Sequence, residues 1–191
     1  SGPSGIEPQS TFYVLDGTPP GETHSGFWQR FGAQLPIDSR IVSPRQTAET
    51  LDELDRLVKR RLTEPNARAA PTYVILFDLA RFRELRKDES YSFSSFDEDD
   101  SPQTSKQFAH LLREGPPQGV HCLIWSDTFN NAQRWLDRQN LRDIEMRVLF
   151  PMSPSDSSAL MDSPAAAQLG ANRAIFYSEQ TGVAEKFRPY S

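Results

Sequence analysis

The segment Thr72–Asp78 constrains the fold of this chain more than any other feature, because it is an apolar run that ends in an acid. A continuous apolar run without polar alternation is typical of a parallel-sheet strand that is buried on both faces. Nucleotide-binding α/β proteins use such a strand to place one carboxylate beside a metal-bound phosphate. The next residue is Leu79 and not a second acid, so the pattern lacks one of the groups that hydrolysis would need.

Apolar periodicity predicts that strands and helices alternate along the chain. The expected strands are Phe12–Leu15, Ser39–Val42, Thr72–Asp78, Val120–Trp125, Glu145–Phe150, Arg173–Tyr177 and Val183–Phe187, and the expected helices are 27–35, 51–62, 79–86, 105–114, 128–138 and 155–161. This alternation indicates an α/β fold with a mainly parallel sheet flanked by helices. The last two strands would close the fold as an antiparallel hairpin around Gln180–Gly182.

Composition narrows the function classes. The 191 residues are 37% hydrophobic, which suits a single α/β domain over 11–191, and 1–10 reads as a linker. The net charge of −5 gives no global reason to bind nucleic acid. Cys122 is the only cysteine, which excludes an internal disulfide and favours a reducing, cytoplasmic setting. No apolar run reaches about 18 residues, so we expect this segment to make no membrane contact.

Residues 88–103 differ in character from the rest of the chain. Six acids and four serines gather in the stretch from Asp88 to Asp100, with Phe93 and Phe96 among them. A segment this acidic and this poor in aliphatic side chains cannot bury enough surface to fold alone. We expect a mobile acidic loop whose two phenylalanines dock on a protein partner or on the domain itself.

Four stretches of the sequence occur in a fixed order, and the first of them is the apolar run that ends in Asp78. The first two stretches are Thr72–Asp78 and Gly119–Asp127. The third is the segment 147–162, which begins with Arg-Val-Leu-Phe and later contains Asp-Ser and Leu-Met-Asp. The fourth is Ala166–Gly170 together with Ala174–Tyr177. In this order and spacing they resemble the motor domain of FtsK/SpoIIIE-type ATPases of the HerA/FtsK superfamily, which pumps double-stranded DNA. Relatives of that family include the ATPases of type VII secretion.

The resemblance implies a RecA-like, P-loop NTPase-type fold. It implies that Asp78 ends the Walker B strand near Mg²⁺, that Ser126 and Asp127 stand at the sensor position, and that Arg147 is a candidate arginine finger for a neighbouring subunit. ATP and Mg²⁺ would be cofactors of the complete protein, with none bound tightly by this chain alone. The implied partners are other ATPase modules in a ring or tandem array and, in the complete protein, DNA. The complete protein could be anchored in a membrane.

The departures from the family pattern predict a degenerate copy. No Gly-x-x-x-x-Gly-Lys-Ser/Thr loop, which cradles the β- and γ-phosphates, occurs in the sequence, and by family order it would precede Phe12. Leu79 replaces the acid that polarises the attacking water, and Asp127 replaces the sensor glutamine. Asn172 and Arg173 replace the Gly-Asp pair after the Leu-Gly segment.

Each candidate residue has a plainer structural alternative. Asp78 could cap the helix that follows it, and Asp127 could cap the helix that begins near Thr128. Arg147 at a strand edge could be a packing residue. His121 and Cys122 are neighbours on one strand, so their side chains point to opposite faces and cannot form a catalytic pair there. The sequence predicts no metal site and no confident catalytic residue.

Two functions remain open at this point. The first is the C-terminal part of an FtsK/SpoIIIE-like translocase that associates with nucleotide but does not hydrolyse it alone. The second is a degenerate pseudo-ATPase that serves as a protein-interaction module through the acidic loop and a peptide-binding crevice at the carboxyl edge of the sheet.

Overall fold

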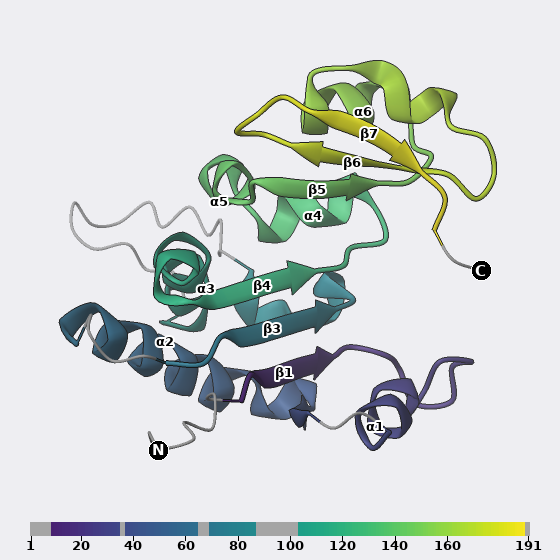
Figure 1. Cartoon of the computed structure of the whole chain (residues 1–191). Coiled ribbons are helices and arrows are strands. Elements are labelled where there is room, and N and C mark those ends of the chain that lie inside the picture. The colour runs from purple at the N-terminus through teal and green to yellow at the C-terminus, as the bar shows by residue number, and fades with distance from the viewer. Residues whose placement is uncertain (1–8, 35–36, 65–68, 87–102, 190–191) are drawn as a thin grey trace, which may run out of the picture. The chain divides into compact units, whose positions relative to one another are not determined.

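The computed structural model describes residues 9–34, 37–64, 69–86 and 103–189 (Figure 1). The acidic segment expected over 88–103 lies outside the described residues except for Gln103, which begins a helix. The chain divides into two compact units, 1–137 and 138–191. Whether 11–191 folds as one domain stays a prediction, and each unit is described by itself below.

The first unit is built on a four-stranded sheet with the order β2-β1-β3-β4. The strands are β1 (Thr11–Asp16), β2 (Asp38–Val42), β3 (Thr72–Phe77) and β4 (Val120–Ile124), and all three pairings are parallel. Val14 lies opposite Ile41 on one side and Ile75 on the other. The predicted parallel α/β architecture is therefore confirmed.

Two long helices accompany this sheet, α2 (Thr47–Thr63) and α3 (Gln103–Glu114). Leu51, Leu54 and Val58 of α2 are spaced three and four apart and are at most 1% exposed. Burial of each such side chain contributes roughly 2 kcal/mol. Inward-facing strand residues, including Leu15, Val74 and Leu76, are equally buried, so this side of the sheet holds the core of the unit.

The segment after β3 differs from the expected helix over 79–86. It forms two short 3₁₀ turns, η2 (Leu79–Arg81) and η3 (Arg83–Leu85), interrupted at Phe82. The apolar spacing that suggested a helix instead directs Leu79, Phe82 and Leu85 into the core, each at most 1% exposed. The shorter helices of the unit are α1 (Phe27–Gly32) and α4 (Phe129–Trp135), and η1 (Pro44–Gln46) and η4 (Pro116–Gln118) are 3₁₀ turns.

The second unit carries a separate three-stranded sheet with the order β5-β6-β7. The strands β5 (Met146–Leu149), β6 (Ala174–Ser178) and β7 (Ala184–Phe187) are antiparallel throughout, which confirms the predicted terminal hairpin and adds β5 to it. The unit also contains α5 (Arg138–Asp143), α6 (Pro154–Met161) and η5 (Pro164–Gln168). Its core comprises Leu149, Met161, Ala166, Ile175 and Tyr177.

A buried serine links α6 to η5 in this unit. Ser157 is fully buried; its hydroxyl donates to the carbonyl of Ser163 at 2.6 Å and accepts from the backbone N–H of Ala166 at 3.0 Å. The Ser-Pro-Ser-Asp start of α6 is capped by Ser153, whose hydroxyl accepts from the backbone N–H of Asp156. Among the described helices, none is long and apolar enough to cross a bilayer.

Candidate functional site

The carboxyl ends of β1, β3 and β4 meet at one edge of the parallel sheet, as parallel pairing requires. The residues that follow these strands are Gly17, Asp78 and Trp125. A backbone hydrogen bond from the N–H of Leu79 to the carbonyl of Trp125 joins two of the strand ends at 3.1 Å. In open α/β sheets, ligands bind beyond the carboxyl ends of the strands. This edge of the sheet is therefore the candidate binding site.

Asp78 leaves β3 in an unusual conformation, with φ 63° and ψ 70° in the left-handed region. Asp and Asn tolerate this region better than most residues. The carboxylate is 18% exposed and accepts from Arg81 Nε at 3.0 Å. It makes no capping hydrogen bond to the turn that follows, so the cap alternative for Asp78 is wrong at the level of the side chain.

Leu79 follows Asp78, at the position where the resemblance to the family implies a second acid. Its side chain is 0% exposed, in the core shared with Phe82 and Leu85. The left-handed turn at Asp78 is the local cause, because it leads Leu79 away from the path that a strand would continue. The structure offers no carboxylate at this position and no room for one in contact with solvent.

Gly17 brings the first strand end tightly against the third. Its N–H donates to the carbonyl of Phe77 at 2.9 Å, and a Cβ on Gly17 would lie 2.7 Å from that oxygen and 2.9 Å from the carbonyl oxygen of Asp78. Only glycine fits such an approach. The next residue, Thr18, has a buried hydroxyl with no hydrogen-bond partner in the described part of the chain. Neither Gly17 nor Thr18 was predicted from the sequence as a site residue.

Ser126 and Asp127 follow β4. The Ser126 hydroxyl donates to the carbonyl of Thr128 at 3.0 Å, and Asp127 Oδ1 accepts from Asn131 Nδ2 at 2.8 Å. The cap of α4 is Thr128, whose hydroxyl accepts from the backbone N–H of Asn131 at 3.1 Å. The cap predicted for Asp127 is thus one residue further on, because the extended backbone of Thr128 aims its own oxygen at the helix start.

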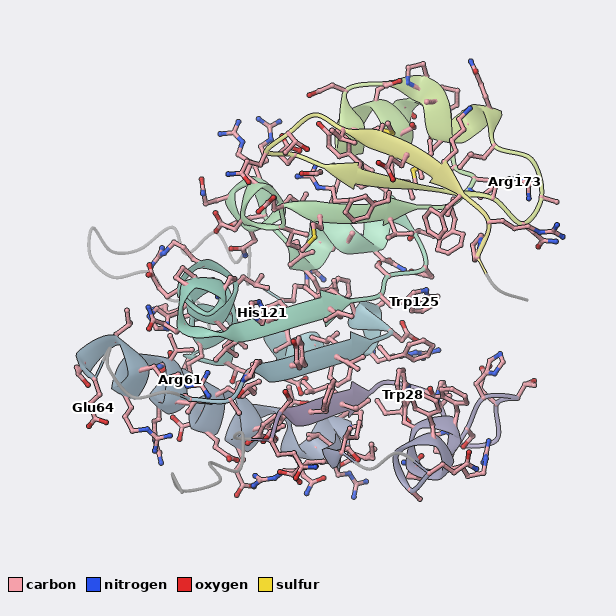
Figure 2. All side chains as sticks on the ribbon, viewed as in Figure 1. Trp28, Arg61, Glu64, His121, Trp125 and Arg173 are labelled. Atoms are coloured by element: carbon pink, nitrogen blue, oxygen red, sulfur yellow. The ribbon has the colours of Figure 1, made fainter. Side chains whose placement is uncertain are left out.

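Aromatic side chains gather beside this edge. Phe77 stacks on Trp125 with ring centroids 4.8 Å apart, and Trp28 meets Phe77 edge-on at 5.9 Å. Phe27 and Phe31 of α1 stack on each other at 5.4 Å. Phe27, Phe31 and Trp125 are 42–43% exposed, so the cluster presents an apolar surface to solvent. Trp28 and Trp125 are labelled in Figure 2. The predicted strand Val120–Trp125 put Trp125 at this edge, and the predicted helix 27–35 gave no sign that Trp28 would reach it.

Arg147 lies on β5, within the second unit. Its guanidinium donates to the carbonyls of Leu160 and Leu141 at 2.5 and 2.8 Å and to Glu179 Oε2 at 2.6 Å. The guanidinium also lies 5.9 Å from the ring of Tyr177, and the side chain is 12% exposed. Such a network fits the packing alternative well. A role as an arginine finger would require these bonds to break, and it stays a prediction.

His121 and Cys122 do not form a reactive pair. Burial raises the pKa of the Cys122 thiol to about 12, so the thiolate is scarce near neutral pH. His121 lies on the opposite face, 5.6 Å from the ring of Tyr73. No group of three or more His, Cys, Asp or Glu within the described ranges could hold a metal ion.

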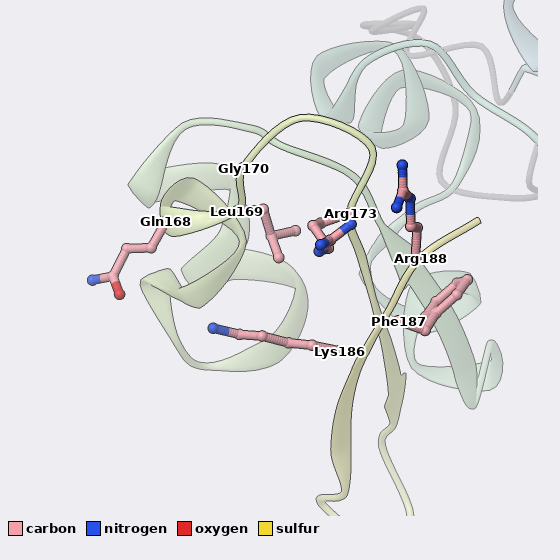
Figure 3. A pocket seen from close by; sticks show the side chains of 7 residues that line it. All are labelled: Gln168, Leu169, Gly170, Arg173, Lys186, Phe187 and Arg188. Atoms are coloured by element: carbon pink, nitrogen blue, oxygen red, sulfur yellow. The ribbon is translucent and has the colours of Figure 1, made fainter. Parts of the chain in front are cut away.

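The second unit carries a cationic notch, defined by Arg173, Lys186 and Arg188 around Gln168–Gly170 and Phe187 (Figure 3). Its volume is about 450 Å³. Arg173 bonds only the carbonyl of Asn172, and among the described residues no carboxylate forms an ion pair with any of the three cations. The sequence missed this site because the cations come from two separate segments that only the pairing of β6 with β7 brings together.

Comparisons with known proteins were informative at the level of structure alone. No model of a known protein family matches the chain, and no characterised protein matches it by sequence. The DNA-packaging ATPase B204 from Sulfolobus turreted icosahedral virus superposes with a TM-score of 0.56 at 8% identity, over 96% of this chain and 84% of that one. The cytoplasmic domain of the type VII secretion ATPase EccC from Thermomonospora curvata superposes at 0.58 and 15% identity, over 94% of this chain and 21% of that one.

A further EccC structure, of ATPases 2 and 3 in complex with a signal sequence peptide, superposes at 0.55 and 14% identity. The superposition covers 96% of the present chain and 32% of that structure, so the present chain corresponds to a small part of the EccC chains. At these identities the likeness shows the fold, which is the RecA-like ATPase fold.

Proposed function

We propose that this chain is a nucleotide-associated module of an FtsK/SpoIIIE-like translocase that does not hydrolyse ATP alone. The fold supports an ATPase-like module, and B204 and EccC, which share that fold, are a packaging ATPase and a secretion ATPase. The observation that carries the non-hydrolytic part is Leu79, which is 0% exposed at the position of the catalytic acid. Without a carboxylate at position 79, this strand end lacks the acid that the resemblance assigns to polarising the attacking water.

The residues present fit a magnesium–nucleotide complex in part. Asp78 could accept a hydrogen bond from a metal-bound water, provided that its carboxylate is shared with Arg81. The unpartnered hydroxyl of Thr18 is a further oxygen near the strand ends. The sequence contains no Walker A lysine loop to hold the β- and γ-phosphates, so tight binding would need groups from another segment or subunit. Bound MgATP would supply the energy of translocation in the assembled protein.

The test is ATP turnover and nucleotide affinity, measured on the 191-residue chain and on its Asp78→Ala variant. We expect no turnover above background and a dissociation constant in the millimolar range or weaker for MgATP. Turnover of about one per minute that disappears in Asp78→Ala would refute the non-hydrolytic assignment. Arg56→Ala is the control, because it changes the charge of an exposed side chain on α2 whose ion pair is with Asp52.

The cationic notch is the surface that we assign to polyanion contact in this function. Guanidinium groups pair with phosphate oxygens in a bidentate manner, and Phe187, which is 39% exposed, offers a ring for stacking. The double variant Lys186→Ala/Arg188→Ala should weaken binding of a short DNA duplex and lower its salt dependence by about two charges. Unchanged binding and salt dependence would remove DNA from this assignment.

A second candidate function is a pseudo-ATPase that binds a peptide at the carboxyl edge. The exposed aromatic cluster of Phe27, Phe31 and Trp125 favours it, since such surfaces mark interaction sites. Deletion of residues 90–102 separates the two candidates. It should abolish partner capture by an interaction module that uses the acidic loop and leave the nucleotide affinity unchanged. Trp125→Ala tests the aromatic cluster on its own.

A further inference from the structure

The β6–β7 hairpin brings the three cations of the cationic notch together. Ala174 lies opposite Phe187 in the antiparallel register of the two strands. Continued by one residue, this register sets Arg173 opposite Arg188, and Lys186, two residues before Arg188, lies on the same face of the sheet. Directly opposed residues of an antiparallel pair are roughly 5 Å apart, so the two arginines start from neighbouring points of the surface.

This arrangement of charges works against the stability of the hairpin. Like charges directly opposite each other destabilise an antiparallel pair. Glu185 is next to Lys186 in the sequence, but it pairs with Phe176, so its side chain lies on the other face of the sheet. Among the described residues, no ion pair relieves any of the three cations. A hollow lined by unrelieved charges of one sign attracts ligands of the opposite sign.

The three cations line a hollow, and they share it with bare backbone. The volume of the notch, about 450 Å³, lies within the range of small-molecule sites. Figure 3 shows the side chains of Arg173 and Lys186 on the same side of the hairpin as Leu169. A Cβ on Gly170 would meet nothing within 4 Å, so a ligand can approach the backbone at this point of the wall.

The shape of the notch selects among phosphate groups. A duplex presents its phosphates as rows of single charges, and neutralising several of them requires cations that are spread along such a row. A phosphomonoester carries nearly two charges at one point near pH 7, with three strong acceptor oxygens. Three cations around one hollow match the second pattern, and a guanidinium group binds such oxygens in a bidentate manner.

We infer that the cationic notch is the site of one phosphomonoester group, which Arg173, Lys186 and Arg188 bind together. The end of a nucleic-acid strand and a free mononucleotide both present this dianion. For the strand end, the inference rests on the polyanion contact that is proposed above for the notch, and it adds that the side of the duplex contributes little. For the mononucleotide, it stands without that contact.

Two internally labelled duplexes of one sequence test the inference, one with 5′-phosphate ends and one with 5′-hydroxyl ends. We expect the 191-residue chain to bind the phosphorylated duplex about tenfold more tightly in fluorescence anisotropy at low salt, and AMP to compete with it. The double variant Lys186→Ala/Arg188→Ala should lose this preference. Arg113→Ala removes an exposed arginine that is paired with Glu114, and it should keep the preference.

The outcomes separate this inference from the proposed function. Equal affinity for the two duplexes, lost in the double variant, would keep the polyanion contact and overturn the phosphomonoester site. A preference for the phosphorylated duplex that survives in the double variant would place the site elsewhere and overturn the inference as well.

If neither duplex binds, the proposed DNA contact fails and AMP alone decides the inference. The amide NMR signals of Gly170 and Arg173 are then followed as AMP is added. Saturable shifts in the parent chain that are absent from the double variant would support a mononucleotide site. Signals that do not move in the parent chain would overturn the inference.

The opposed arginines supply a second readout that needs no nucleic acid. Arg188→Gln removes the repulsion with Arg173, so it should raise the melting temperature of the ligand-free chain at low salt. The same variant should lose the stabilisation that inorganic phosphate gives to the parent chain over chloride at equal ionic strength. The control Arg113→Gln should show neither effect. If Arg188→Gln melts below the parent chain and is still stabilised by phosphate, the inference is wrong.

Discussion

Restoring the missing acid by Leu79→Glu should damage the fold without creating an ATPase. Leu79 is 0% exposed and packs in the core of the first unit. Removing a buried leucine side chain costs about 2–5 kcal/mol, and burying a carboxyl group without a hydrogen-bond partner costs at least about 1–3 kcal/mol more. The expected loss is therefore about 4 kcal/mol or more at pH 7. For a chain of this size, that corresponds to a melting temperature lowered by roughly 8–16 °C.

The pH dependence distinguishes the buried charge from simple loss of packing. Burial raises the pKa of a carboxyl group, so the folded variant would bind a proton that the unfolded chain releases near pH 4–5. The folded state of Leu79→Glu should therefore regain stability as the pH falls from 7 toward 5. Leu79→Gln, which is similar in shape and uncharged, is the matched control and should lack this pH-dependent recovery relative to the parent chain.

Thermal melts followed by circular dichroism, together with urea unfolding at pH 5 and 7, measure these differences. A Leu79→Glu variant that melts within 2 °C of the parent at pH 7 would refute the argument. Such a result would mean that position 79 reaches solvent at the strand ends. If that variant also gained ATP turnover, the non-hydrolytic assignment of this chain would fail with it.

Three further outcomes are expected. The guanidinium of Arg61 donates to the backbone carbonyls of Ala70, Gln118 and Gly119. Arg61→Met should therefore lower the free energy of unfolding, measured in urea titrations, by about 2–4 kcal/mol. The control Arg60→Met, at an exposed neighbouring position, should change that free energy by less than about 0.5 kcal/mol. Burial and the hydrogen bond to Glu53 raise the pKa of Tyr13 to about 12, above the value of 10 in an unfolded chain. The contribution of this phenol to the stability of the folded state is therefore complete below pH 10 and is lost as the pH rises from 10 to 12. The melting temperature of Tyr13→Phe should accordingly fall less steeply than that of the parent chain over this range. Ser157→Ala leaves a buried N–H and a carbonyl without partners and should cost about 1–3 kcal/mol, and a melting temperature equal to that of the exposed control Ser155→Ala would contradict this.

The sequence predicted the parallel sheet well because strand signals are local. The strands expected over 72–78 and 120–125 coincide with β3 and β4 within one residue at each end. The helix expected over 79–86 was wrong because the same apolar spacing also suits two 3₁₀ turns, and the left-handed conformation of Asp78 decides between them. The spacing of apolar residues does not determine the backbone angles of an individual residue such as Asp78.

The candidate site was predictable in part. The positions of Asp78, Ser126 and Asp127 at neighbouring strand ends follow from parallel pairing alone. The partners of their side chains do not, since Arg81, Thr128 and Asn131 are reached through turns whose geometry the sequence leaves open. The cationic notch depends on the register of β6 with β7, which brings Arg173 close to Lys186 and Arg188, and register is a property of tertiary structure.

The exposed aromatic cluster at the carboxyl edge of the sheet has a consequence for how the protein is made. Chains leave the ribosome amino end first, and domains fold as they emerge. Phe27 and Phe31 are synthesised long before Trp125, so the cluster is complete only after β4 has emerged and paired with β3. Until then these apolar side chains meet water and other nascent chains, and crowded expression should therefore favour aggregation.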